Sequence, residues 1–469
     1  MSLPRPVVLI VVALVAVSSF LLGTGSASAS SRQAVYFEAP RDLLNASTRD
    51  HALSELDSLG VHALRVTLYW RSVAPAPDSS ARPAFVATDP RAYAWGQYDA
   101  VLAAATQRHW PVLLTVSGPV PRWATAARRD NVTRPSAQEY GMFMTAVARQ
   151  YRTEVQTYSV WNEPNHPQFL DPQYVHGRPA SPRIYRALFQ AGYSGLKAGG
   201  IAHPNVLMGE TAPRGTGHDV APLTFLRGAL CLDASYHRSS SCSALPATGY
   251  AHHAYTTTAG PFFVPPGPND VTIGVLSRLT RALDRAARAR ALAPHLGLYL
   301  TEFGIQSKPN PFLGVSLSLQ AQFQEISEHI AYQNSRVRAF SQYLLRDDAQ
   351  VSRPSSGSHS GFIGFQSGLE LANGRPKPAL AGFRLPLVVH HHGAAVSLWG
   401  LVRPALGATS VQVLIQDGRS SHLRLLTTAS TNAAGYWHAR GGYRRGRHWR
   451  VRWRSPTGTV FTGPPIGPE

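Results

Sequence analysis

Hydrophobic positions between residues 31 and about 387 follow two alternating patterns. Short apolar runs, such as residues 64–70 and 112–117, are typical of buried strands, whereas residues 53–59 carry leucines at helical spacing. Alternation of strands and helices predicts βα units arranged around a parallel sheet. Because the alternation repeats about eight times, it predicts an α/β fold of the (β/α)8 type, the TIM barrel.

The expected strands can be placed to within several residues. After the third of them, Ser136 and Glu139 form a capping box, a pair that predicts the start of a helix. The eight strand ranges are 35–38, 64–70, 112–117, 155–161, 206–210, 249–255, 298–303 and 337–345.

A different pattern begins past residue 387. Helical periodicity stops, and short strands with alternating apolar and polar residues take its place. In residues 448–454 tryptophan or valine occupies one face and arginine the other, as a half-buried strand requires. We therefore expect a barrel over residues 30–387 followed by a small C-terminal β-sandwich over residues 388–469.

The N-terminal residues predict export. Arg5 is the only charge before an apolar run over residues 7–22, and small residues follow up to Ala29. This order is that of a secretory signal peptide covering residues 1–29. The run is shorter than the roughly 20 apolar residues that span a bilayer. We expect a secreted protein, extracellular or attached to the cell wall, with no membrane span after cleavage.

The cysteines and histidines bear on cofactors. Cys231 and Cys242 are the only cysteines and lie in one Ser-rich stretch of an exported chain, so we expect a local disulfide. The triple His390-His391-His392 has no carboxylates at ligand spacing, which favours a solvated linker over a metal site. We expect neither a metal nor a cofactor, and we expect a monomer.

The formal net charge is +19, carried almost entirely by arginine. Two interpretations remain open: an arginine-rich composition without functional meaning, which is slightly favoured, and attraction to anionic cell-wall polymers. Nucleic acid is not expected as a partner, because the charge is spread along the chain and no recognition motif accompanies it.

Two glutamates stand at the ends of expected strands. Glu163 closes the fourth strand in a Trp-Asn-Glu-Pro motif, and Glu302 closes the seventh in a Thr-Glu-Phe-Gly motif. The carboxyl ends of barrel strands open onto one face, where active sites lie. Cleavage of a glycosidic bond needs two carboxyl groups, which stand about 5–5.5 Å apart in retaining enzymes. Regular alternation would point Asn162 and Glu163 to opposite faces, so we expect a bulge there.

These two motifs resemble those of clan A glycoside hydrolases, closest to family 39 and the cellulase-like branch, over residues 31 to about 387. The resemblance implies that Glu163 is the general acid/base and Glu302 the nucleophile. It also implies that Asn162 binds the hydroxyl next to the anomeric carbon and that Arg65 is the strand-two arginine beside the nucleophile. His253 and Tyr255 match the strand-six histidine and aromatic residue.

One departure from the family concerns the sugar site. Many clan members carry a tryptophan at the end of strand eight, where this chain has Phe-Ser-Gln-Tyr-Leu-Leu over residues 340–345. Trp123, just after strand three, could stack on a sugar or pack under a loop with equal odds. Glu38 and Glu210 at other strand ends could contact substrate or serve in structural ion pairs. The sugar and linkage therefore stay open.

The motifs favour a secreted retaining glycosidase that acts on an oligo- or polysaccharide through a covalent intermediate. A catalytically silent carbohydrate-binding or cell-wall-associated barrel is the second interpretation, and the presence of both glutamates argues against it. A transglycosylase using the same residues is a third.

Overall fold

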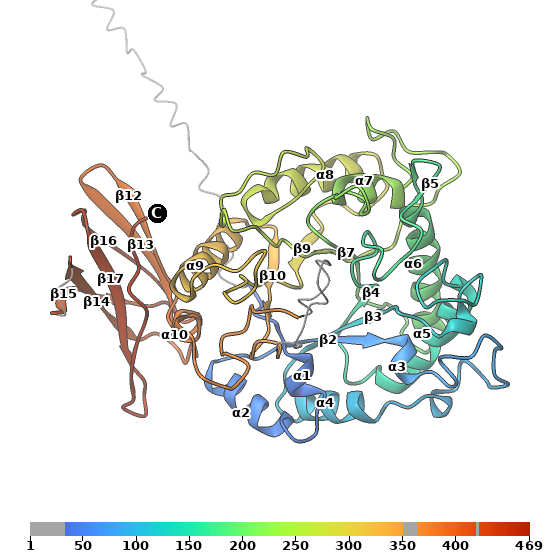
Figure 1. Ribbon diagram of the computed structural model, residues 1–469, viewed down its shortest axis with the longest axis horizontal. Helices are drawn as coiled ribbons and strands as arrows, with labels where there is room; N and C mark the ends of the chain where they lie inside the picture. Colours follow the sequence, from blue (N-terminus) through green and yellow to red (C-terminus); the bar gives the residue numbers. More distant parts are fainter. Residues whose placement is uncertain (1–32, 350–363, 419–421) are drawn as a thin grey trace, which may run out of the picture.

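The computed structural model (Figure 1) describes residues 33–349, 364–418 and 422–469. The expected signal peptide, residues 1–29, lies outside these ranges. Within them, no helix is both long and apolar enough to cross a membrane.

A parallel sheet that closes on itself forms the larger part of the molecule, as predicted. Its strands follow the order β10-β9-β8-β7-β4-β3-β2-β1-β11. The predicted eighth strand is divided at Ser341 into β10, which pairs with β9, and β11, which pairs with β1, and these pairings close the barrel. The strands are β1 (Phe37–Glu38), β2 (Leu64–Tyr69), β3 (Val112–Ser117), β4 (Thr157–Val160), β7 (Val206–Thr211), β8 (Gly249–His252), β9 (Gly297–Leu300), β10 (Val337–Phe340) and β11 (Gln342–Tyr343).

Helices surround this sheet (Figure 1). The capping box is confirmed at α5, where the Ser136 hydroxyl accepts a hydrogen bond from the Glu139 amide at 3.3 Å. Cys231 and Cys242 form the predicted disulfide between α7 and β8. The helices are α1 (Pro40–Leu43), α2 (Arg49–Ser58), α3 (Trp70–Val73), α4 (Gly96–Gln107), α5 (Ala137–Tyr151), α6 (Ser181–Ala198), α7 (Pro222–Ala229), α8 (Leu276–Arg288), α9 (Leu317–Gln333) and α10 (Pro378–Arg384).

Short elements occupy the loops between these helices and strands. The 3-10 turns are η1 (Pro90–Ala92), η2 (Arg122–Ala124) and η3 (Ile273–Val275), and a small hairpin joins β5 (Tyr174–Val175) to β6 (Arg178–Pro179).

Buried polar residues interrupt the apolar barrel strands at a few places. Both faces of a parallel sheet are covered, so its strands are apolar almost throughout. Arg65 in β2, Thr115 in β3 and Glu210 in β7 are exceptions, each at most 1% exposed. They bond to one another, as buried polar groups must. Arg65, Thr115 and Glu210 therefore form a buried polar cluster inside an otherwise apolar barrel.

Two antiparallel sheets form the C-terminal sandwich. One contains β12 (Leu387–His392), β13 (Ala395–Leu401) and β16 (Tyr436–Gly442); the other contains β14 (Ser410–Asp417), β15 (Arg424–Ser430), β17 (Arg447–Arg454) and β18 (Val460–Thr462). Trp449, Val451 and Trp453 of β17 lie in its core, which confirms the alternation predicted there. The histidine triple is the end of strand β12, so the linker prediction was wrong.

The sandwich packs on the outer side of α9, beside α10 (Figure 1). The Tyr332 ring of α9 lies 5.3 Å from Trp399 and 4.6 Å from Tyr436 of the sandwich. A buried ion pair joins Glu328 of α9 to Arg403, just past β13. This contact lies on the outside of the barrel, away from the carboxyl ends of its strands.

Candidate active site

Glu163 stands on an irregular backbone just beyond β4. The strand ends at Val160, and both Trp161 (φ 72°) and Glu163 (φ 39°) adopt the left-handed region, which is rare for residues other than glycine. The strand end is irregular, as expected, but the irregularity consists of two left-handed residues past the strand and not of the predicted bulge. The recorded register shift lies in the neighbouring β7, between Gly209 and Thr211. Such strain is typical of functional sites, where surrounding contacts hold it in place.

Glu302 follows β9 and is held on both carboxylate oxygens. Tyr255 donates its hydroxyl to Oε1 at 2.6 Å, and Arg65 donates Nη1 to Oε2 at 3.0 Å. Burial favours the neutral acid, but His253, Arg65 and the Tyr255 hydroxyl outweigh it and lower the pKa of Glu302. Burial and Glu302 raise the pKa of Tyr255, which therefore stays a donor. Glu302 is thus ionised at neutral pH.

His253 lies between the two glutamates. Its Nδ1 is 2.9 Å from Glu163 Oε1 and 3.7 Å from Glu302 Oε2, and the ring is fully buried. Burial alone would lower the pKa of His253, but the charges of Glu302 and Glu163 raise it. Glu163 Oε1 and Glu302 Oε2 are therefore separated by at most the sum of these two distances.

Arg65 is the centre of the polar network. Its guanidinium contacts Glu38 and Glu302 through Nη1, and it donates Nη2 to Asn162 and to Glu210, each at 2.7 Å. Burial raises the pKa of Glu38 to about 7, although Arg65 opposes the shift. Arg65 therefore fixes Glu302 and Asn162 relative to each other.

Glu210 joins this network to Glu163. Its backbone carbonyl accepts a hydrogen bond from the Glu163 amide at 3.0 Å, and its carboxylate accepts from Thr115 at 2.8 Å. Glu210 itself has φ 45° at the β7 irregularity. Glu38 and Glu210 both form ion pairs with Arg65. Of the two roles considered for these glutamates, the ion pair is the one that the structure shows.

Trp123 does not reach this site. It is 3% exposed and packs edge-on against Trp70 at 5.8 Å, and its indole nitrogen donates to the Pro75 carbonyl at 3.1 Å. Both tryptophans belong to the core under the loops. Of the two roles considered for Trp123, packing is the one present.

A cavity of about 370 Å³ opens beside Glu163 and Tyr255. Phe365 lines it, with its ring 6.2 Å from Tyr255 and 5.1 Å from Tyr343. The Phe365 backbone is anchored because its amide donates to the Asp348 carboxylate at 2.7 Å. Phe365 thus places an aromatic ring at the cavity beside Tyr343 of β11. Sequence reasoning missed it because it belongs to a long segment without helical or strand periodicity.

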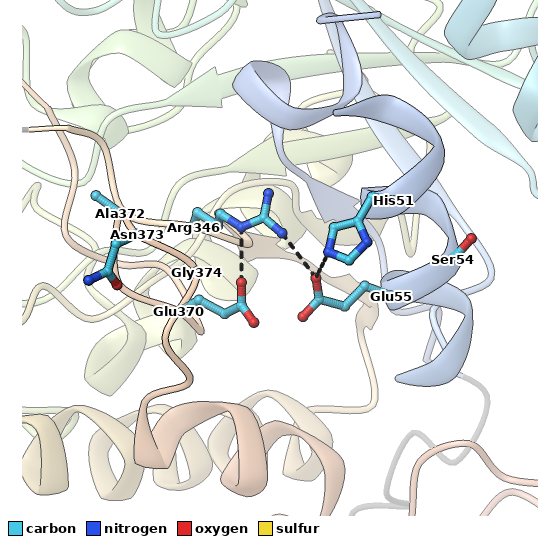
Figure 2. Close-up of a pocket in the computed structure, with 8 residues that line it drawn as sticks. All are labelled: His51, Ser54, Glu55, Arg346, Glu370, Ala372, Asn373 and Gly374. Atoms are coloured by element: carbon cyan, nitrogen blue, oxygen red, sulfur yellow. Dashed lines mark hydrogen bonds and ion pairs between the residues drawn. The ribbon is translucent and has the colours of Figure 1, made fainter. Parts of the chain in front are cut away.

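A second cavity, of about 760 Å³, lies between α2 and the chain that follows β11 (Figure 2). Arg346 pairs there with Glu370 at 3.0 Å and with Glu55 at 3.4 Å, and it also pairs with Asp42 at 2.9 Å. Burial raises the pKa of Glu370 to about 7, and neighbouring Glu55 adds to the shift. The positive charge of Arg346 compensates these carboxylates, and its ion pairs hold the loop that carries Glu370 next to α2. None of the glutamates and histidines of the candidate active site lines this cavity.

The barrel fold is one found among glycosidases of clan A. No model of a known protein family matches the chain, and no curated protein matches it. A glucosidase from Croceicoccus marinus superposes with a TM-score of 0.52 at 10% identity, over 89% of this chain and 94% of the glucosidase. At that identity the likeness shows a shared fold.

Two other solved structures are similar at lower scores. GH5_18 from Streptomyces cattleya, in complex with GlcNAc, has a TM-score of 0.47 at 17% identity, over 74% of this chain and 78% of that one. The β-glycosidase of the hyperthermophile Thermosphaera aggregans has a TM-score of 0.47 at 15% identity, over 72% and 84%.

Proposed function

We propose that this protein is a secreted retaining glycoside hydrolase acting on an oligo- or polysaccharide, with Glu302 as nucleophile and Glu163 as general acid/base. The observation that carries the proposal is the meeting of both glutamates at one imidazole, His253, beside a cavity at the carboxyl ends of the barrel strands. Residues 30–387 form the catalytic barrel in this assignment, and residues 388–469 form an accessory sandwich.

In the first step Glu302 attacks the anomeric carbon while Glu163 donates its proton to the leaving oxygen. The glycosidic bond breaks and a covalent ester forms between the sugar and Glu302. In the second step Glu163 removes a proton from water, which attacks the anomeric carbon and releases Glu302. Arg65 and Tyr255 suit the first step because they stabilise the charged form of the nucleophile.

The separation of the two carboxylates distinguishes retaining from inverting enzymes. Retaining enzymes hold the two groups about 5–5.5 Å apart, and inverting enzymes about 6.5–9.5 Å apart to admit a water molecule. The limit set by the two contacts of His253 lies at the lower edge of the inverting range. This limit applies to one pair of oxygens, Glu163 Oε1 and Glu302 Oε2, and it is compatible with direct attack by Glu302.

Asn162 has a position that suits sugar binding. Its amide oxygen accepts from Arg65 at 2.7 Å, and its backbone amide donates to the Ser117 hydroxyl at 2.9 Å. With the oxygen occupied, the side-chain NH2 is left to donate to a hydroxyl next to the anomeric carbon. Export, a monomeric state and the clan A family relationship belong to the same proposal, and the disulfide agrees with an oxidising compartment.

The test is a panel of aryl glycosides hydrolysed by the wild type, Glu302→Gln, Glu163→Gln and a control, Glu154→Gln, whose side chain lies past α5. We expect Glu302→Gln to lose turnover on every substrate. Glu163→Gln should still form the ester from substrates whose leaving group needs no proton, because the first step then needs no acid, but it should turn them over slowly because the second step lacks its general base. Wild-type rates in Glu302→Gln would refute the assignment, and no turnover in the wild type would favour a silent barrel.

A further inference from the structure

Three donor residues meet where the sandwich packs on the barrel. His329 lies on α9, His390 on β12, and Glu469 runs beside β12, where its amide donates to the Val389 carbonyl at 3.0 Å. Nδ1 of His329 is 3.0 Å from Nε2 of His390, and the Glu469 carboxylate contacts Nδ1 of His390. One donor atom from each of the three residues lies within 4.8 Å of the others.

The site is buried, and among the described residues the Glu469 carboxylate has one charged or titratable partner, the imidazole of His390. His329 is 5% exposed and the Glu469 side chain 8% exposed. Among the described residues, neither Glu469 carboxylate oxygen has a partner that meets hydrogen-bond geometry. A buried carboxylate is costly unless a cation or several hydrogen bonds compensate its charge. A cation bound beside His390 would compensate the charge of this carboxylate.

The donor set matches the preference of zinc. Two imidazole nitrogens and one carboxylate oxygen are common zinc ligands, with Zn–N bonds of about 2.0–2.1 Å. Two nitrogens on a tetrahedral zinc then stand roughly 3.3 Å apart, close to the 3.0 Å between His329 and His390. The other histidines of the triple have different partners: His391 contacts the Gly393 carbonyl, and His392 contacts the Ser397 hydroxyl.

We propose that His329, His390 and Glu469 bind Zn²⁺, or a divalent transition metal of similar chemistry, and that the ion joins the barrel to the sandwich. The Glu469 carboxylate exchanges its contact with His390 Nδ1 for a bond to the metal, and water completes the coordination. Because the ligands come from α9 and from the sandwich, the bound ion opposes separation of the two parts. This proposal is independent of the hydrolytic one and concerns a different face of the molecule.

The experiment uses the full chain, purified through a tag that contains no histidine and dialysed against a chelator. Zn²⁺ is then added and measured by metal analysis, and the melting temperature is followed as its concentration rises. We expect one zinc per chain and a melting temperature that increases with zinc. Co²⁺ in place of Zn²⁺ should give the visible absorption of a tetrahedral nitrogen and oxygen site.

Three variants separate the buried site from the exposed histidines. His329→Ala and Glu469→Gln should each weaken zinc binding at least tenfold, whereas His391→Ala should keep wild-type binding. A wild type that binds no zinc would overturn the proposal and leave a hydrogen-bonded chain from Glu469 through His390 to His329. Equal loss in His391→Ala would also overturn it, because the exposed triple would then be the site. If His329→Ala fails to fold, His390→Asn replaces it, with near-ultraviolet circular dichroism as the folding check.

Discussion

The Tyr255 hydroxyl offers a direct way to perturb the proposed nucleophile. Tyr255→Phe removes the hydrogen bond of 2.6 Å to Glu302 Oε1 and keeps the half-buried ring in place. A hydrogen bond to a charged group contributes about 1.5–3 kcal/mol, and each 1.36 kcal/mol changes an ionisation equilibrium about tenfold. Loss of the bond should therefore disfavour the carboxylate by about ten- to a hundredfold.

The sign of the effect follows from which form the hydroxyl stabilises. Tyr255 lowers the pKa of Glu302, so its removal raises that pKa. A nucleophile must be ionised, and the acidic limb of kcat/KM against pH should move to higher pH in Tyr255→Phe. At pH values well above the acidic limb, kcat/KM of Tyr255→Phe should fall less than it does at pH values within the limb.

A matched control is Tyr343→Phe. Tyr343 is a neighbouring half-buried tyrosine for which no hydrogen bond to Glu302 is found among the described residues, so the acidic limb of Tyr343→Phe should stay close to that of the wild type. An unmoved limb in Tyr255→Phe, or a shift to lower pH, would refute the role given to this hydroxyl. A shift of equal size in both variants would point to a general change of the site.

Three further predictions concern charges buried in the barrel. Glu210→Gln should lower kcat more than it changes KM, because Arg65 loses one of its anchors and holds the nucleophile less firmly; steady-state kinetics beside Glu154→Gln measure this. Burial raises the pKa of Glu38 from 4.5 to about 7, so the folded wild type should lose stability as pH rises through that window. Glu38→Gln should lack that decline in urea unfolding at pH 5 and pH 8. Lys377→Met leaves Asp347 buried without its cation at 2.6 Å and should cost about 3–5 kcal/mol of unfolding free energy, which urea denaturation would detect.

Strand positions were predictable because the barrel strands are apolar at most of their positions. The runs at 64–70 and 112–117 match β2 and β3 almost residue for residue. Strand ends were less predictable. The expected ranges 155–161, 249–255 and 298–303 each run past the observed strand, because the last residues belong to the site and not to the ladder.

The partners of each site residue could not be read from local patterns. Glu163 and Glu302 carry recognisable motifs, but Glu38 and Glu210 are single glutamates whose role depends on Arg65, which only the closed barrel brings to them. Phe365 carries no motif at all. The pairing of His329 with His390 joins a helix to a strand 61 residues away, so sequence spacing carried no signal of it.

The central claim is that Glu302 forms a covalent bond to the sugar. The most direct measurement uses a 2-fluoro glycoside with an activated leaving group, of a sugar cleaved in the aryl glycoside panel, followed by peptide mass spectrometry. The account predicts one fluoroglycosyl group per chain, attached to the peptide containing Glu302 and absent in Glu302→Gln. A label on another residue, or product of inverted configuration without any label, would contradict it.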